Sequence, residues 1–233
     1  MSEYKNESST ERPTHTVEDY LMFMHLMTQD DGVIVAARLA ELLDVTPATV
    51  TMTIKRMERD QWVVNRGRGD ITLTKAGQAA ADSVTRRHML VECMLVNLLK
   101  VPINETHAEA HAIEHAISPA LEERLREVLG DPKLCPHGNP FPGHEELVSD
   151  WLPLTDFQEG QQVIIRRIHM FAEERPALIR FLYDHSIVPG VRGEIIDVLP
   201  FNQTLGIRLE NEVVTLGVQT AQWIFAEVLL PEK

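Results

Sequence analysis

Four side chains able to bind a metal ion fall within nine residues of this chain. If residues 104–117 form a helix, His107, His111, Glu114 and His115 stand at i, i+4, i+7 and i+8, which is a single stripe. Such a stripe normally carries leucine or isoleucine into a core. Burying four polar donors without partners would cost several kcal/mol each, so the stripe must face water, a partner or a cation. One cation could bind all four side chains and so satisfy them together. The sequence therefore predicts a metal site here.

Neighbouring predicted helices carry further donors. His88 and Glu92 are four residues apart, and Asp19 and Met22 are three apart, so each pair shares a helix face. Each has an ordinary alternative, namely surface neighbours for the first pair, a helix-dipole acid for Asp19 and core packing for Met22. With the stripe, these imidazoles and carboxylates suit Mn(II) or Fe(II) better than copper and leave Zn(II) open. The donors exceed one coordination shell, which allows two ions per subunit.

The composition is that of a globular protein of two or three domains, with 233 residues and 44% hydrophobic content. No apolar run approaches the roughly 20 residues needed to span a bilayer, so we expect a cytoplasmic protein with no membrane partner. The two cysteines, Cys93 and Cys135, are expected to be reduced, with no cysteine-based zinc site. The segment 135–143 is dense in proline and glycine and is interpreted as a rigid surface connector.

Charge is unevenly distributed. The chain carries a formal net charge of −13, which argues against indiscriminate nucleic-acid binding, but residues 33–75 hold seven basic side chains against five acidic ones. Helices predicted over 35–43 and 48–60, then strands over 62–65 and 70–74, form a winged helix-turn-helix. The alternative is an ordinary helical packing unit with a basic turn. The predicted DNA contacts are Thr46, Pro47, Ala48, Thr49, Thr51, Met52, Lys55 and Arg56 on the second helix, and Arg66 and Arg68 on the hairpin.

The predicted fold is mainly α with a β C-terminal part. The expected order is a disordered tail (1–13), a winged helix-turn-helix domain (14–75), a helical metal-binding and dimerisation domain (76–143), a linker (144–160) and a small β-barrel (161–233). Apolar side chains on the middle helices exceed what so small a unit can hide, which favours a symmetric homodimer. These side chains are Met94, Leu95, Leu98, Ile113, Ile117 and Leu121.

Several motifs in combination resemble one known family. They are Thr16-Val-Glu-Asp-Tyr-Leu, Met57-Glu-Arg-Asp at the end of the winged helix, Arg87-His88-x-Leu-Val-Glu92, His107-x3-His111-x2-Glu114-His115-Ala-Ile-Ser118, and Cys135-Pro-His-Gly-Asn-Pro-x-Pro-Gly143. Over about residues 14–230, the chain resembles the diphtheria toxin repressor family of metal-dependent regulators. The resemblance implies a cytoplasmic homodimer with an SH3-like C-terminal domain. When loaded with Fe(II) or Mn(II), it would bind palindromic operator DNA and repress metal-uptake genes.

The resemblance also implies two sets of ligands. One set is His88, Glu92 and His107, to which the C-terminal domain would add an acid, Glu173 or Glu174. The other set is Asp19, His111, Glu114 and His115.

Three positions bear on which type of the family this chain resembles. Asp19 stands where iron-type members have methionine and manganese-type members have aspartate, while His111 stands where these types have cysteine and glutamate. Met22 stands at a glutamate of the manganese type. The resemblance therefore favours Mn(II), with an iron-responsive repressor as the alternative.

Two other classes remain. His111-Ala-Ile-Glu114-His115 matches the H-x-x-E-H pattern of inverted zinc peptidases, in which a glutamate between two histidine ligands activates water, so a zinc-dependent hydrolase is the enzymatic alternative. Such enzymes need a far larger catalytic unit, and no small organic substrate is expected here. The third class is a DNA-binding protein whose metal is purely structural.

Overall fold

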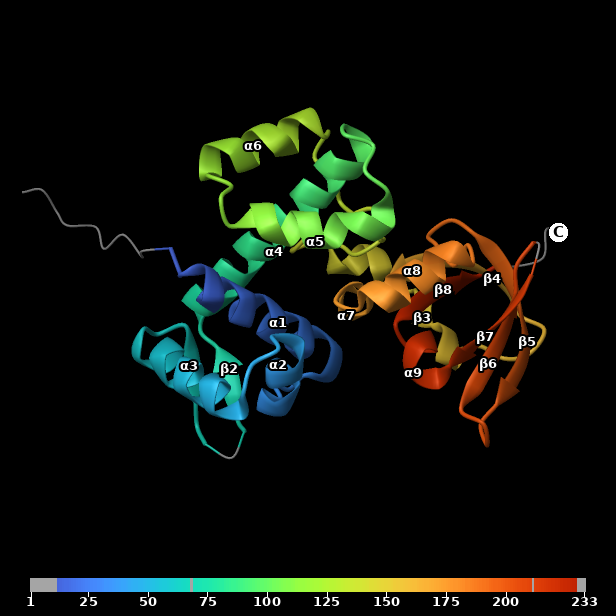
Figure 1. The fold of residues 1–233 in the computed structure, drawn as a ribbon, viewed down its shortest axis with the longest axis horizontal. Helices are drawn as coiled ribbons and strands as arrows, with labels where there is room; N and C mark the ends of the chain where they lie inside the picture. Colours follow the sequence, from blue (N-terminus) through green and yellow to red (C-terminus); the bar gives the residue numbers. More distant parts are fainter. Residues whose placement is uncertain (1–11, 68, 211, 230–233) are drawn as a thin grey trace, which may run out of the picture. The chain divides into compact units, whose positions relative to one another are not determined.

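The computed structural model describes residues 12–67, 69–210 and 212–229 (Figure 1). The chain divides into two compact units, Met1–Thr85 and Arg86–Lys233. Most of the tail predicted to be disordered, and Arg68 of the predicted hairpin, lie outside the described residues. No helix in the described ranges is long and apolar enough to cross a membrane.

The first unit is a winged helix-turn-helix, as predicted. Its elements are α1 (His15–Asp31), α2 (Ala36–Leu42), α3 (Pro47–Arg59), β1 (Val63–Asn65), β2 (Ile71–Leu73) and the first part of α4 (Lys75–Asn97). Thr46 caps α3 by accepting a hydrogen bond from the Thr49 amide, and Pro47 occupies the first helical position, so the local sequence sets where this helix begins. The antiparallel strands β1 and β2 form the wing, with Val63 opposite Leu73.

The second unit starts with three helical segments. The remainder of α4 is followed by α5 (Ile103–Glu114), which carries the histidine stripe, and α6 (Pro119–Val128). Ser118 caps α6, and its side chain accepts a hydrogen bond from the Leu121 amide at 3.3 Å. Helix α5 begins after Pro102 and ends with His115 as its C-terminal cap, so the whole stripe lies on or next to one helix.

A six-stranded antiparallel sheet completes the second unit, in the order β3-β8-β4-β5-β6-β7. The elements of this part are η1 (Glu145–Val148), β3 (Leu152–Pro153), η2 (Leu154–Asp156), β4 (Gln162–Ile168), α7 (Met170–Glu173), α8 (Pro176–Asp184), β5 (Arg192–Leu199), β6 (Thr204–Arg208), β7 (Val213–Gly217), α9 (Val218–Ala221) and β8 (Ile224–Val228). The predicted linker is too long at its C-terminal end. Residues 152–153 pair with β8, and Leu154 and Phe157 are buried in the core under the sheet.

The Pro/Gly-rich loop is not the surface connector that the sequence predicted. Cys135 is 5% exposed and His137 is fully buried. The His137 carbonyl accepts a hydrogen bond from the Ile168 amide at 2.8 Å, which attaches the loop to the end of β4. Gly138 permits this close approach, because it has a φ of +85° and a Cβ at this position would lie 2.1 Å from the carbonyl oxygen of Arg166. The loop is therefore an internal element that joins the helical part to the sheet.

Candidate metal centre

The histidine stripe on α5 divides between two groups of donors. His107 faces acids of the C-terminal part, whereas His111, Glu114 and His115 form a separate group. We call these last three residues the α5 trio. The expectation that one cation would bind all four side chains is therefore wrong, since His107 belongs to another group. Two ligand sets were implied by the family resemblance, and the described residues divide in the same way.

Glu114 lies at the centre of the α5 trio. Its side chain is fully buried, with Oε1 3.3 Å from Nδ1 of His111 and 3.4 Å from Nε2 of His115. Its other oxygen, Oε2, contacts Nδ1 of His88. Asp19 and Met22 lie on α1, in the first unit, and Met22 is fully buried there. Their participation in this site stays a prediction.

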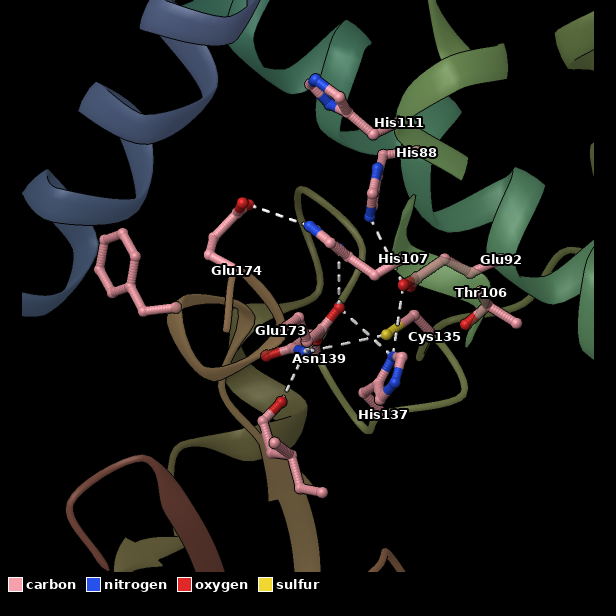
Figure 2. A network of polar contacts seen from close by, with 12 residues as sticks. His88, Glu92, Thr106, His107, His111, Cys135, His137, Asn139, Glu173 and Glu174 are labelled. Carbon is pink, nitrogen blue, oxygen red and sulfur yellow. Dashed lines mark hydrogen bonds and ion pairs between the residues drawn. The ribbon is translucent and has the colours of Figure 1, made fainter. Parts of the chain in front are cut away.

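A second group of donors comes from three elements. His88 and Glu92 extend from α4, His107 from α5 and Glu173 from α7, and their donor atoms lie within 4.8 Å of one another (Figure 2). His88 Nε2 is 3.4 Å from Glu92 Oε1, and His107 Nδ1 is 3.4 Å from Glu173 Oε2. Glu174 lies 3.1 Å from the other ring nitrogen of His107. Both acids suggested for the C-terminal domain are thus beside the predicted ligands.

The sequence analysis missed two donors of the buried loop. Cys135 and His137 lie with Glu92 in a third group, again with donor atoms within 4.8 Å of one another. His137 Nδ1 is 3.3 Å from Glu92 Oε1 and 3.4 Å from Glu173 Oε2. The Cys-x-His spacing was the signal that could have revealed them, but the density of proline and glycine suggested exposure instead.

We call the last two groups together the buried pocket. Its members are His88, Glu92, His107, Cys135, His137 and Glu173. Among the described residues, seven of its polar atoms are buried without a hydrogen-bond partner. They are His88 Nε2, both carboxylate oxygens of Glu92, His107 Nδ1, both ring nitrogens of His137 and Glu173 Oε2. So many converging orphaned donors are costly unless a cation satisfies them, so the residues fit a bound metal ion.

The pKa values of side chains in and beside the buried pocket also support a bound cation. Burial alone would lower the pKa of His107, but the carboxylates of Glu173 and Glu174 raise it to about 10. Burial likewise opposes ionisation of Glu114, yet His111 and His88 lower its pKa to about 2. In the metal-free protein, protons on the imidazoles therefore balance the buried carboxylates. Metal ions can replace those protons as the balancing charge.

Burial and neighbouring charges also shift the pKa values of Cys135, Glu173 and Glu92. Burial, with the nearby carboxylates of Glu92 and Glu173, raises the pKa of the Cys135 thiol well above its ordinary value. Burial also raises the pKa of Glu173, whereas the imidazoles of His137 and His88 outweigh burial at Glu92 and hold its pKa well below the usual range. Cys135 is thus a protonated thiol until a cation draws near.

The predicted DNA contacts lie on one helix and the wing of the first unit. All eight candidates on and just before α3 are exposed, while Val50, Ile54 and Met57 of the same helix are buried. Arg66 on the wing is also exposed. The chain therefore presents the N-terminal part of α3 and one basic hairpin residue to the surroundings. A recognition helix and a wing need these exposed positions.

Comparison with known proteins places each part of the chain. Residues 13–70 match the family described as iron dependent repressor, N-terminal DNA binding domain. Residues 74–143 match iron dependent repressor, metal binding and dimerisation domain, and residues 152–228 match the FeoA domain. A winged helix joined to a domain of histidine and carboxylate donors defines a metal-dependent, DNA-binding transcriptional regulator.

Full-length relatives agree with this class. The iron-dependent repressor IdeR of Mycobacterium leprae is 32% identical over 223 residues, which cover 91% of this chain and 96% of the relative. The diphtheria toxin repressor of Corynebacterium diphtheriae is 38% identical over 132 residues, 57% of this chain and 58% of the relative. A solved manganese-dependent transcriptional repressor in complex with manganese superposes with a TM-score of 0.79 at 28% identity, over 91% of this chain and all of that one. The chain belongs to the diphtheria toxin repressor family.

Membership in this family decides against the enzymatic alternative. The relatives are transcriptional repressors, not enzymes, so a zinc-dependent hydrolase built on His111, Glu114 and His115 has no support. In this fold the H-x-x-E-H spacing places the Glu114 carboxylate beside both histidines of the α5 trio.

Proposed function

We propose that this chain is a manganese-responsive repressor that binds palindromic operator DNA as a homodimer and represses metal-uptake genes. The observation that carries the proposal is the set of buried, orphaned donor atoms in a chain that also contains a winged helix. Mn(II) is favoured over Fe(II) because Asp19, the predicted fourth ligand beside the α5 trio, stands where manganese-type members of the family have aspartate and iron-type members have methionine. Fe(II) is the alternative corepressor, as in the iron-dependent relatives.

Metal would act by ordering the DNA-binding unit. In this proposal Asp19 on α1 joins the α5 trio through the bound ion, so the ion ties the first unit to the second. Metal then favours the arrangement in which two copies of α3 are spaced for successive turns of DNA. In the metal-free state no ion joins Asp19 to the α5 trio, so nothing in this proposal favours that arrangement.

The proposed homodimer would use apolar side chains of the helical part. Leu98 and Leu121 are exposed, as the predicted interface requires, together with Leu99 and Val128. Leu95 and Ile117 are buried within the protomer, so their assignment to the interface is wrong. Exposed leucines on α6 and at the end of α4 are the surface that a second copy would cover.

The decisive experiment is selection of DNA fragments from a random pool by the purified protein. Selection is run with Mn(II), with Fe(II) under anaerobic conditions, and with chelator. We expect a palindrome recovered with Mn(II) and lost with chelator. Equal recovery with chelator would make the metal purely structural, better recovery with Fe(II) would make the protein an iron sensor, and no recovery under any condition would refute the proposal.

A pair of variants tests the role of Asp19. Asp19→Ala should abolish metal-dependent operator binding while leaving a folded dimer, because it removes only the ligand that the first unit contributes. Glu105→Ala is a matched control, since this exposed acid on α5 belongs to none of the donor groups of the described residues. Unchanged metal dependence in Asp19→Ala would show that the proposed coupling is wrong.

A further inference from the structure

A small cavity in the second unit lies on a different side of α4 from the metal donors, and we call it the α4 cavity. Arg86 and Leu90, one turn apart on α4, line it, and His88 is two residues from each. Residues four apart share a helix face, whereas a residue two positions away points to another side of the helix. None of the lining residues belongs to a donor group of the described residues, so this cavity is a separate place in the molecule.

Apolar side chains form one wall of the α4 cavity. Leu90 is 1% exposed and Phe141 is 5% exposed, and Pro132 and Pro142 complete this apolar wall. The cavity volume is about 50 Å³. A single water needs about 10–15 Å³ and benzene is held by a cavity of about 150 Å³, so the space suits a group of roughly three to five heavy atoms.

Two polar side chains on the lining have unused hydrogen-bond donors. The Arg86 guanidinium donates no hydrogen bond to the described residues, and its charged partner there is Glu122, with 3.5 Å between Nη1 and Oε1. The His144 ring makes no hydrogen bond to them either, since Glu146 lies 3.9 Å from its Nδ1. The planar fork of an arginine matches the two oxygens of a carboxylate. The open donors therefore favour a carboxylate ligand.

The other charged side chains of the lining balance one another. Arg126 donates to Glu123 Oε1 at 2.7 Å and to Asp131 Oδ1 at 2.9 Å, and Asp131 also accepts from Lys133 Nζ at 2.6 Å. Two cations thus offset the Asp131 carboxylate, which leaves no uncompensated negative charge beside the cavity. Each of these side chains is more than 40% exposed, and exposed ion pairs are weak, so they give way to a ligand at little cost.

We propose that the α4 cavity binds a small organic carboxylate, whose charged group is held by Arg86 and His144 and whose short apolar part lies on the apolar wall. Inorganic phosphate would satisfy the guanidinium but would leave the apolar wall without a partner, so the lining favours an organic acid of a few carbons. The inference is independent of the metal and operator binding proposed above, and it adds a ligand of a different chemical class.

The test is a titration of the full-length protein with acetate, butyrate, butyramide and inorganic phosphate, followed by NMR of the leucine methyl groups. Metal is first removed with chelator and the chelator is dialysed away, because a carboxylate also binds to metal ions. The Leu90 signal is assigned with Leu90→Ile. We expect this signal to shift saturably with butyrate and to require more acetate, which covers less of the apolar wall. Butyramide and phosphate should bind at least about tenfold more weakly than butyrate.

A pair of arginine variants locates the carboxylate. Arg86→Gln should weaken butyrate binding about tenfold or more, because it removes the charged donor. Arg124→Gln is the matched control and should bind butyrate as the unchanged protein does, since Arg124 is 77% exposed on α6 and lies outside the lining. Circular dichroism establishes that each variant is folded. If Arg86→Gln does not fold, His144→Ala replaces it, and we expect a severalfold weakening.

Four results would overturn the carboxylate site. The first is a Leu90 signal that does not shift saturably with any carboxylate. The second is equal affinity for butyrate and butyramide, which would show that charge is not recognised. The third is phosphate bound as tightly as butyrate, which would show that the apolar wall contributes nothing. The fourth is an Arg86→Gln variant, or the His144→Ala variant in its place, that binds butyrate as tightly as Arg124→Gln does.

Discussion

Replacement of Gly138 by alanine tests how the loop that carries Cys135 and His137 is held. Gly138 has a φ of +85°, and an added Cβ would lie 2.1 Å from the Arg166 carbonyl oxygen and 2.9 Å from the Arg167 Cα. Forcing a residue with a side chain into the left-handed region costs about 1–2 kcal/mol. The overlap with the backbone of β4 adds about 1–3 kcal/mol, as overpacking does in protein cores. Gly138→Ala should therefore lower the free energy of unfolding by about 2–5 kcal/mol.

The same loop provides the control. Gly143 has a φ of +89°, but an added Cβ there would meet nothing within 4 Å. Gly143→Ala should therefore lower the free energy of unfolding only by the backbone part, about 1–2 kcal/mol. Both variants are measured by denaturant unfolding in the presence of chelator, so that differences in metal binding do not enter the comparison.

Metal binding gives a second measurement on the same pair. A shift of the loop away from β4 moves Cys135 and His137 relative to Glu92, and loss of such supporting contacts typically weakens metal affinity by about 10–100-fold. In Mn(II) titrations, the metal affinity should fall in Gly138→Ala and persist in Gly143→Ala. Equal losses of stability in the two variants, with equal metal affinities, would refute the docking of this loop on β4.

The remaining predictions concern the cap of α3, the wing and the metal itself. Thr46→Ala removes the acceptor for the Thr49 amide and should lower the stability of the first unit by about 1 kcal/mol, measured by thermal unfolding; an unchanged midpoint would contradict the cap. Arg66→Ala should weaken operator binding similarly for all sequences and reduce the salt dependence by about one phosphate contact, whereas Arg124→Ala, an exposed arginine on α6, should not. Mn(II) at about 100 times its dissociation constant should raise the free energy of unfolding by about 2.7 kcal/mol per site, and chelator should reverse this; a melting temperature indifferent to both would argue against a folded-state site.

Local signals in the sequence were sufficient for the winged helix. Thr46 and Pro47 define the start of α3 through a cap and a fixed φ, and these effects act over one turn of chain. The spacing of the histidines on α5 predicted donors on one helix. It could not show that His107 would face a different group of donors from the other three residues of the stripe. That depends on Glu173, which is far away in sequence and was suggested only by the family resemblance.

The buried loop shows where local reasoning fails. Proline and glycine indicate turns, but a turn is buried or exposed according to what packs on it. Here the determining contacts come from β4, whose Ile168 pairs with His137 and whose Arg166 leaves room only for glycine at position 138. Strand β3 was missed for a related reason, since its two residues form a strand only by pairing with β8, more than 70 residues later. Burial and pairing at these points are properties of the folded domain.

One carboxylate connects the α5 trio to the buried pocket. Glu114 directs Oε1 at His111 and His115, while its Oε2 contacts Nδ1 of His88. A hydrogen bond from Nδ1 to this carboxylate fixes the His88 ring and leaves Nε2 facing Glu92, where it would be the donor to a bound metal ion. With a cation bound at Oε1, Glu114 would present less negative charge to His88, and with an ion bound at His88 the basicity of Glu114 would fall. The two effects are reciprocal by linkage. In the proposed repressor the donor groups therefore respond to metal as a coupled set, in which occupancy of the buried pocket tunes the trio that Asp19 is proposed to join.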